Sequence, residues 1–542
     1  MVLSEKYIFN LLQKYFKKYG PWTQQIESYE NFIKEMQMII NEEPIIETEI
    51  EGDMLYIAKF GKCFLNKPII IEENRKIRKP TPAECLIRDI SYLGILTVNI
   101  DTYIVKVFEG NKQILEHKKY KKHEIAKIPI MVGSSKCNLY GKNKDERVKL
   151  GQCLWDNGGY FIINGKERVI IAQERANYNK ISVYLSKNKA KSLYYADIRS
   201  LSDATGHSVL IKAFIDKDGK NISFSLPYIT SNIPAGIVLT ALGCKYEDIY
   251  TIIGIDNPKV KKIINFLTRE SFFVKDKADA LSYIGQYSMH TIPVDKRPSY
   301  ADQLLSNELF PHLGIVNSDK QKILFLCLIL NKLIKTYLGL RPCDDRDNIS
   351  NKRVESTGTL MRELFRALYK RFVRAIHPQL LKRPDIVVAI SRINNITQGM
   401  RHCFATGNWG IQKNSYIRTG VSQVLSRLSY GGFISHLQRL IIPVGKEGKN
   451  TQIRQLHGSQ IGFICPCETP EGQAAGIVKN FALTAKITKY INPIIVQEEI
   501  ENIGDIILVN NIKLNDIKDS YKIFLNGMWI GITLNFEKLV KK

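Results

Sequence analysis

The chain has 542 residues, 44% of them hydrophobic and 24% charged, which is the composition of a multidomain globular protein and excludes wholesale disorder. Lysine and arginine outnumber aspartate and glutamate by 78 to 53, so the formal charge of +25 favours a polyanionic partner such as nucleic acid. Compositional drift in AT-rich coding DNA, which enriches Lys, Ile and Asn, could supply part of that charge.

The N-terminal part combines helical and strand patterns. Apolar residues recur at helical spacing over 4–18 and 26–40, so two helices are predicted there. Over 44–71 the pattern changes to the alternation of strands, and turns are predicted at Gly52-Asp53 and at Gly61.

Two short basic clusters follow, at 75–79 and 118–122. Each could face a phosphate backbone, but basic runs this short are more often solvated loops. Both interpretations stay open.

A β-hairpin is predicted at 158–171. Two β-rich arms flank Asn164-Gly165, the pair best suited to a type I′ turn because both turn residues then need positive φ. After Asn179 the composition changes to Ser, Lys and short strands, which indicates a new module. Residues 301–338 are predicted to be mainly helical.

Three aspartates, Asp344, Asp345 and Asp347, precede a helix predicted at 356–376. Carboxylates are the ligands that hard cations prefer, so a magnesium site is one interpretation. Arg346 lies among the aspartates and further basic residues follow. A network of ion pairs at a domain junction is therefore favoured over a metal site.

From Gly399 onward, glycine-rich and apolar segments alternate. Residues 404–410 predict a loop that exposes one aromatic side chain, Trp409. A helix with a single apolar stripe is predicted from the spacing of Val421, Val424, Leu425 and Leu428.

A turn-rich loop at 443–450 carries Lys446 and Lys449, with Arg439 before it and Arg454 after it. The loop is not a phosphate-binding P-loop, because its glycine spacing is wrong and no Ser or Thr follows the lysine. Arginines suit a nucleic-acid setting, since the planar guanidinium binds phosphate bidentately and stacks on bases.

The segment 464–473, ICPCETPEGQ, is predicted to be a rigid, acidic turn that leads into a buried element. Its prolines fix φ, and Gly472 permits positive φ. Glu468 and Glu471 are its two acids. From composition alone, an ordinary loop between strands is the simpler interpretation.

The ten cysteines are scattered and form no CxxC pair, so no structural zinc site is predicted. His436 and His457 lack a third ligand and are interpreted as structural. Residues 1–20 lack the apolar region of a secretory signal, and the longest apolar run, 323–330, is too short to span a bilayer. A soluble protein of a reducing intracellular compartment is expected.

Eight of these segments, taken in order, resemble signatures of the second-largest subunit of multisubunit DNA-directed RNA polymerases. The residues in these segments resemble the eukaryotic, archaeal and giant-virus branch more than the bacterial one. The segments are 82–94, 128–132, 158–174, 309–314, 344–353, 404–410, 420–430 and 465–473.

The resemblance implies an α+β multidomain fold of mixed helices and antiparallel sheets. The implied domains are a protrusion at 1–179 and 341–397, an inserted lobe at 180–340, a fork at 398–486 and the start of an external domain at 487–542. The chain stops about halfway through such a subunit. One half of a split subunit, or a gene interrupted by an intron, intein or frameshift, is therefore expected.

The resemblance also implies roles in DNA-templated nucleotidyl transfer, with no catalytic residue on this chain. Lys446 and Lys449 would lie near the downstream edge of the transcription bubble, and Arg439 and Arg454 would line the cleft. Glu468 and Glu471 would face the mobile elements of the largest subunit. By the same resemblance, Mg²⁺ would be held by the largest subunit, and this chain would bind no cofactor itself.

The implied partners are the largest subunit, the remaining C-terminal half of the second-largest subunit, smaller polymerase subunits, the DNA template and the RNA–DNA hybrid, with no membrane. The expected location is the nucleus, or the cytoplasm or virion if the protein is viral. The alternative is a non-catalytic, basic nucleic-acid-binding scaffold or a relic of a split polymerase gene. A self-sufficient nuclease or ATPase finds no support in the motifs.

Overall fold

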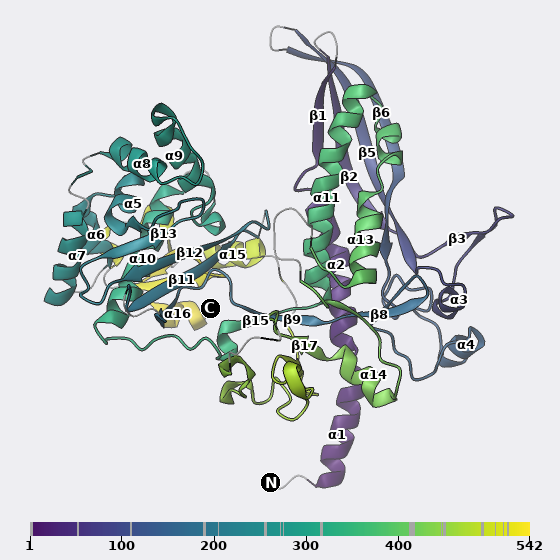
Figure 1. Ribbon diagram of the computed structural model, residues 1–542. Helices are drawn as coiled ribbons and strands as arrows, with labels where there is room; N and C mark the ends of the chain where they lie inside the picture. Colours follow the sequence, from purple (N-terminus) through teal and green to yellow (C-terminus); the bar gives the residue numbers. More distant parts are fainter. Residues whose placement is uncertain are drawn as a thin grey trace. The chain divides into compact units, whose positions relative to one another are not determined.

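The computed structural model divides the chain into two compact units, each built from two stretches of sequence (Figure 1). The first unit joins Met1–Arg175 to Asp347–Tyr490, and the second joins Ala176–Arg346 to Ile491–Lys542. The structure describes residues 4–50, 54–108, 111–187, 191–203, 205–253, 257–270, 273–274, 276–314, 318–410, 418–445, 447, 451–488, 491, 493–503, 506–512, 514–517 and 520–541.

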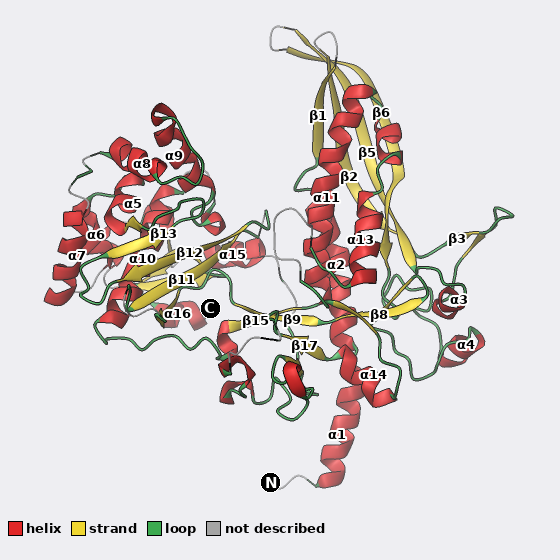
Figure 2. Ribbon diagram, viewed as in Figure 1, coloured by secondary structure: helices red, strands yellow, loops and turns green. Residues whose placement is uncertain are grey.

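Helices and antiparallel strands are mixed in both units (Figure 2), which confirms the predicted α+β class. The domain borders expected from the family resemblance stay a prediction.

The first unit is organised around a long antiparallel sheet in the order β1-β2-β5-β6. Its strands are β1 (Ile45–Ile50), β2 (Met54–Leu65), β5 (Leu93–Phe108) and β6 (Asn111–Pro129). The predicted turn at Gly61 is wrong, because Gly61 lies inside β2, where the register with β5 shifts between Phe60 and Cys63. A glycine within a strand often marks such a bulge. Gly52-Asp53 lies outside the described residues.

Helices pack along this sheet and bury a continuous core. The predicted N-terminal helices are confirmed as α1 (Glu5–Lys18) and α2 (Thr23–Ile40). The remaining helices of the unit are α3 (Pro82–Ile87), α4 (Lys144–Lys149), α11 (Thr357–Lys382), α12 (Ile386–Ser391), α13 (Asn395–Thr406) and α14 (Tyr430–Leu437). Phe32 of α2 meets Phe365 of α11 edge to face at 6.1 Å, an arrangement that the aromatic quadrupole favours.

Three smaller sheets complete the first unit, in the orders β16-β8-β7, β15-β9-β17-β18 and β3-β4. Their strands are β3 (Ile70–Ile71), β4 (Ile77–Arg78), β7 (Phe161–Ile163), β8 (Lys166–Ile170), β9 (Ala172–Ala176), β15 (Lys352–Glu355), β16 (Ser422–Val424), β17 (Arg439–Ile441) and β18 (Val478–Asn480).

The predicted hairpin is confirmed. Asn164 and Gly165, with φ of +50° and +68°, connect β7 to β8 as a type I′ turn requires. Ser91 and Arg401 fix the turn, since both donate a hydrogen bond to the Asn164 side-chain oxygen.

The helix predicted from the apolar spacing over 421–428 is wrong. Residues 422–424 form β16, which pairs antiparallel with β8. Val421 and Leu425 are buried, whereas Leu428 is 97% exposed. Four apolar residues over two turns are a weak helical signal, and hydrogen bonds across to the hairpin override it. A helix, α14, begins later, where the Ser429 side chain accepts a hydrogen bond from the Gly432 amide.

The prediction that Trp409 is exposed is also wrong, because the side chain is only 5% exposed. Its ring packs edge to face on Phe404 at 5.2 Å, and its Nε1 donates to the Leu360 carbonyl at 2.9 Å. The left-handed Gly407 ends α13 and turns the chain back towards this core.

The two basic clusters have different settings. Residues 75–79 form β4 and the turn before it. Residues 118–122 lie within β6 and are not the expected loop, although their four lysines are exposed. Contact of either cluster with nucleic acid stays a prediction.

The second unit contains a sheet in the order β10-β11-β12-β13-β14 and another in the order β19-β21-β20. Its strands are β10 (Ser182–Leu185), β11 (Tyr194–Leu201), β12 (Ser208–Ile215), β13 (Ile222–Ser225), β14 (Ile233–Pro234), β19 (Ile507–Leu508), β20 (Tyr521–Leu525) and β21 (Met528–Thr533). Its helices are α5 (Ala235–Ala241), α6 (Tyr246–Ile253), α7 (Pro258–Glu270), α8 (Lys277–Gln286), α9 (Arg297–Asn307), α10 (Asp319–Tyr337), α15 (Pro493–Asn502) and α16 (Phe536–Lys541). The helical character predicted for 301–338 is thereby confirmed.

Candidate nucleic-acid interface

Four of the predicted site residues, Arg439, Arg454, Glu468 and Glu471, belong to the first unit and lie in or near the sheet β15-β9-β17-β18. Strand β17 starts at Arg439, runs parallel to β9 and pairs antiparallel with β18, so that Arg439 lies opposite Asn480. All three residues of β18 are buried. This sheet is therefore a firm base for the loops at its edge.

The segment 464–476 forms the turn that the sequence predicts. The Cys465 amide donates to the Asn480 carbonyl at 2.9 Å. The Thr469 hydroxyl donates to the Val478 carbonyl and accepts from the Gly476 amide, each at 2.9 Å. These hydrogen bonds fasten the turn to the backbone of β18. The position of the acidic residues at its tip is therefore fixed by the chain on either side of them.

Arg454 is the main side chain that supports this turn. Its Nη1 donates to the carbonyls of Gln473 and Ala475, at 2.6 and 2.9 Å. The contact is close because Gly476, with φ of +72°, lets the chain pass the Arg454 backbone. A Cβ at Gly476 would lie 2.3 Å from the Arg454 carbonyl oxygen. Sequence reasoning gave Arg454 a place in the cleft and missed this structural role.

Glu468 is exposed on the turn and joins a chain of polar contacts. Its carboxylate accepts a hydrogen bond from the Ser435 hydroxyl of α14. The side-chain Nδ2 of Asn480 in turn donates to that hydroxyl at 2.8 Å. The network fixes the position of one carboxylate relative to β18. Glu471 is exposed at the start of the short helix Gly472–Ala474.

Arg439 is half-buried beside this network. Burial lowers the pKa of its guanidinium, and the negative charge of Glu468 acts in the opposite direction. Its Nε is buried without a hydrogen-bond partner among the described residues. An unsatisfied buried donor is costly, so an additional acceptor that reached this nitrogen, such as a phosphate or carboxylate oxygen, would be favoured.

Lys446 and Lys449 lie outside the described residues. Of the predicted site residues, the structure therefore brings together Arg439 with Glu468, and Arg454 with the turn that carries Glu471.

Sequence reasoning missed a buried ion triad beneath the site. Glu174 of β9 lies 3.2 Å from Lys352 of β15 and 3.1 Å from Lys479 of β18. Glu174 and Lys479 are 6% and 7% exposed. One carboxylate thus joins three strands of the sheet. The lysine in the largely apolar segment GIVKN indicates a buried ion pair, but the sequence does not show that Glu174 is its partner.

The two histidines of this region are structural, as predicted. His436 is buried, its Nδ1 accepts from the Ser426 amide at 3.1 Å and its Nε2 lies 3.0 Å from the Gln423 side-chain oxygen. Burial, aided by the nearby Arg439 charge, lowers the pKa of His436 to about 4. The imidazole is neutral at physiological pH, with its proton on Nε2. His457 caps the short helix Gly458–Gln460.

Within the aspartate cluster, Asp344 forms an ion pair of the predicted kind, and the network predicted for all three aspartates stays a prediction. Asp344 accepts from Arg341 at 2.6 Å and from the Val183 amide at 2.8 Å. Arg346 lies 3.6 Å from Asp197 and stacks over the Tyr184 ring. In the part of the chain that the structure describes, there is no group of three or more His, Cys, Asp or Glu placed to hold a metal ion.

Comparison with known protein families gives two matches along the chain. The model of the RNA polymerase beta subunit matches residues 21–398, and the model of RNA polymerase Rpb2, domain 3, matches residues 423–487. The second match covers the turn, the ion triad's Lys479 and the candidate interface.

Curated relatives agree with these matches. The chain is 33% identical to DNA-directed RNA polymerase II subunit 2 of Arabidopsis thaliana over 99% of its own length and 48% of that protein. It is 33% identical to a probable RNA polymerase II subunit RPB2 homolog of Invertebrate iridescent virus 6, again over 99% of this chain but 50% of the relative. The chain thus spans about half the length of these relatives.

A shorter relative matches from end to end. DNA-directed RNA polymerase subunit Rpo2N of Methanocaldococcus jannaschii is 35% identical over 88% of this chain and 95% of that subunit. Across the described residues, no helix combines the length and apolarity needed to cross a bilayer.

Proposed function

The chain belongs to the RNA polymerase beta subunit family, and from that premise we propose that it serves DNA-templated transcription as the N-terminal part of a second-largest subunit. The observation that carries the proposal is the match to Rpo2N, an RNA polymerase subunit of nearly the same extent. The reaction served is nucleotidyl transfer, and the proposed contribution of this chain is positioning and electrostatics.

The candidate interface supports a place beside nucleic acid. Arg439 has an unsatisfied buried Nε and lies next to a turn whose position is fixed by Arg454. A preorganised guanidinium loses little entropy when it binds phosphate, which favours such a role. Lys446 and Lys449, which follow β17 in the sequence, are proposed to add positive charge near the downstream edge of the bubble.

The proposal includes partners that complete the subunit and the enzyme. They are the largest subunit, which is proposed to supply the catalytic Mg²⁺, smaller subunits, and a polypeptide equivalent to the second half of the longer relatives. Template DNA and the RNA–DNA hybrid are the proposed nucleic-acid partners, and the nucleus or a viral compartment is the proposed location. Glu468 and Glu471 are proposed to face the largest subunit.

An uncovered apolar helix supports a partner chain. In α1, Phe9 is 62% exposed and Leu11 54%, and no residue of this helix is buried. Only its C-terminal end is tied down within the first unit, where Tyr15 donates to the Thr484 carbonyl at 3.1 Å. Exposed apolar surface of this kind supports a protein interface at α1.

Affinity purification of the tagged protein from its source, followed by mass spectrometry of every co-purifying chain, tests the proposal. We expect a largest polymerase subunit and a polypeptide carrying the second half of the family sequence. Recovery of this protein alone, with or without DNA, would contradict the proposal and favour a stand-alone scaffold.

A further inference from the structure

Residues 68–80 form a narrow two-stranded arm that projects from the first unit next to α3 (Figure 1). Strands β3 and β4 pair with each other through Ile70 opposite Arg78 and Ile71 opposite Ile77. No third strand joins them among the described residues. A two-stranded ribbon is marginally stable by itself, so its surroundings must hold it.

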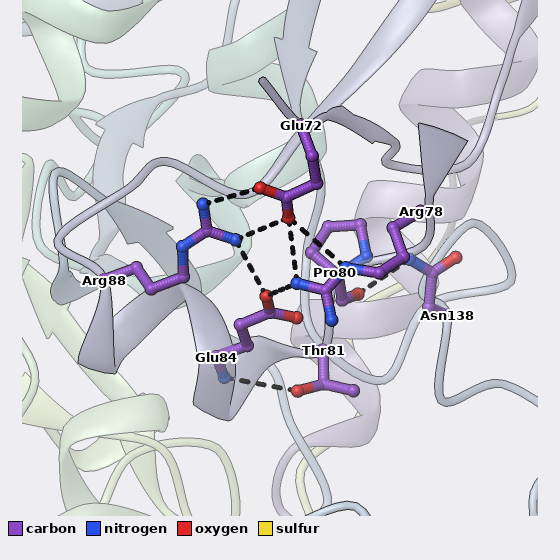
Figure 3. A network of polar contacts seen from close by, with 7 residues as sticks. All are labelled: Glu72, Arg78, Pro80, Thr81, Glu84, Arg88 and Asn138. Carbon is purple, nitrogen blue, oxygen red and sulfur yellow. Dashed lines mark hydrogen bonds and ion pairs between the residues drawn. The ribbon is translucent and has the colours of Figure 1, made fainter. Parts of the chain in front are cut away.

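The base of the arm is closed by one side chain. The Asn138 amide nitrogen donates to the Pro68 carbonyl at 3.1 Å and to the Pro80 carbonyl at 2.8 Å. Asn138 therefore fastens the chain on entry to the arm and on exit from it, and Figure 3 shows the bond to Pro80. Pro80 is buried, which anchors this end further.

One face of the arm is held by a network of four charged side chains (Figure 3). Arg88 of α3's C-terminal end contacts Glu72 at 2.8 Å and Glu84 at 3.0 Å. Arg78 of β4 contacts the same two carboxylates, at 2.9 Å for Glu72. Single exposed ion pairs stabilise little, but shared, partly bidentate pairs that join two elements restrict their relative motion.

The opposite face of the arm is apolar and uncovered. Side chains alternate along a strand, so Ile71 and Ile77 point away from the face that carries Glu72 and Arg78. Each isoleucine is 67% exposed. Being directly opposite each other, they form one small apolar surface. The ion-pair network thus holds the arm so that this surface stays in solvent.

Positive charge borders the apolar pair. Arg75 and Lys79 alternate with Lys76 and Arg78, so they lie on the face of Ile77. Both are exposed and form no ion pair among the described residues, and Glu73 is the one exposed acid beside them. Nucleic acid would be matched by the cations, but paired isoleucines offer its bases no stacking face and no hydrogen bond, so they add more to a contact with apolar protein side chains. A protein segment can match both features.

We propose that this arm is a docking surface for a protein segment whose apolar side chains are flanked by aspartate or glutamate. The apolar side chains would cover Ile71 and Ile77, and the acids would pair with Arg75 and Lys79. The free edges of β3 and β4 can also pair with an extended backbone. This inference goes beyond the proposed function and does not depend on it.

Photo-crosslinking in the native complex tests the docking surface. A benzophenone amino acid replaces Ile71 or Ile77 in the tagged full chain expressed in its source, and the crosslinked peptide is sequenced. Ile114 of β6, which is 60% exposed outside the arm, is the control position. We expect a product from 71 and 77, absent at 114, whose peptide joins apolar residues to acids.

Charge reversal makes the test specific. In the R75E/K79E background we expect crosslink yield from position 71 to fall about tenfold, which corresponds to roughly 1.4 kcal/mol. K119E/K121E, at exposed lysines of β6, makes the same change in net charge and should leave the yield unchanged. Thermal unfolding of each variant checks that the fold is retained.

Three outcomes would overturn the proposal: no product from the arm, a product with nucleic acid, or a protein product that R75E/K79E leaves unchanged. The same preparations show whether a largest polymerase subunit co-purifies. Failure of the docking surface and failure of the proposed function are therefore told apart.

Discussion

At the scale of single residues, Arg454 links the candidate interface to the turn that shapes it. Arg454→Ala removes the hydrogen bonds to Gln473 and Ala475, so we expect faster hydrogen exchange over 472–477. An assembled enzyme carrying this variant should elongate RNA more slowly, while its subunit composition is unchanged.

The matched control for this prediction is Gln452→Ala, an exposed neighbour in the short helix Gln452–Arg454. Normal elongation by the Arg454→Ala enzyme would refute the role in transcription. Unchanged hydrogen exchange would refute the structural role.

His436 makes a prediction about pH. Its folded pKa of about 4 lies below the ordinary value of 6.5, so between these values the unfolded chain binds more protons than the folded one. Stability is therefore fully present above about pH 6.5 and falls towards pH 4, by at most about 1.4 kcal/mol per pH unit from this group. Urea unfolding of wild type and His436→Gln across this range measures the effect. An identical pH dependence in both proteins would show that His436 does not contribute.

At the scale of secondary-structure elements, the buried triad makes β9, β15 and β18 depend on one another. Glu174→Ala leaves Lys352 and Lys479 without their carboxylate, and an uncompensated buried charge typically costs about 3–5 kcal/mol. We expect chemical denaturation to show a loss of this size. The double variant Glu174→Ala, Lys479→Met should recover part of it, because one buried charge is removed. No recovery would mean that strand packing, not charge, is responsible.

Asn138 makes a prediction for the arm. Asn138→Ala removes both hydrogen bonds at its base, so protease cleavage and hydrogen exchange over 70–78 should increase while the long sheet is unaffected. Glu73→Ala, at the exposed tip, is the control. Equal protection in Asn138→Ala and wild type would show that the ion-pair network alone holds the arm.

The sequence predicted elements whose signals are local. Asn164-Gly165 predicts a type I′ turn because both residues readily adopt positive φ. The helical spacing of apolar residues continues over enough turns in α1 and α2 to predict helices there. It misled where tertiary contacts decide the outcome. The spacing from Val421 to Leu428 is helical, yet the hairpin offers hydrogen bonds that make a strand, and Trp409 is buried by residues distant in sequence.

The candidate site was predictable in part for the same reason. The turn was predicted from its local prolines and glycine, whereas Arg439 and Glu468 were singled out by the family resemblance, and their roles stay predictions. The pairing of Glu174 with Lys479, which are distant in sequence, arises only when β9 and β18 join one sheet.

At the scale of the whole molecule, the chain spans about half of its longer relatives, and α1 offers uncovered apolar surface. If a polypeptide equivalent to the missing half covers α1, Leu11→Glu and Leu12→Glu should each place an unpaired charge in that interface. We expect either variant to lower recovery of that polypeptide in affinity purification at least about tenfold, since such a charge costs more than about 1.4 kcal/mol.

Gln13→Glu introduces the same charge on the polar face of α1, and recovery should match that of wild type. Because no residue of α1 is buried within its unit, the substitutions have little effect on the fold of this chain itself. A general loss of every partner in all three variants would indicate misfolding instead. Full recovery with Leu11→Glu and Leu12→Glu would show that another surface joins the two halves, because a buried glutamate cannot be accommodated without a compensating cation.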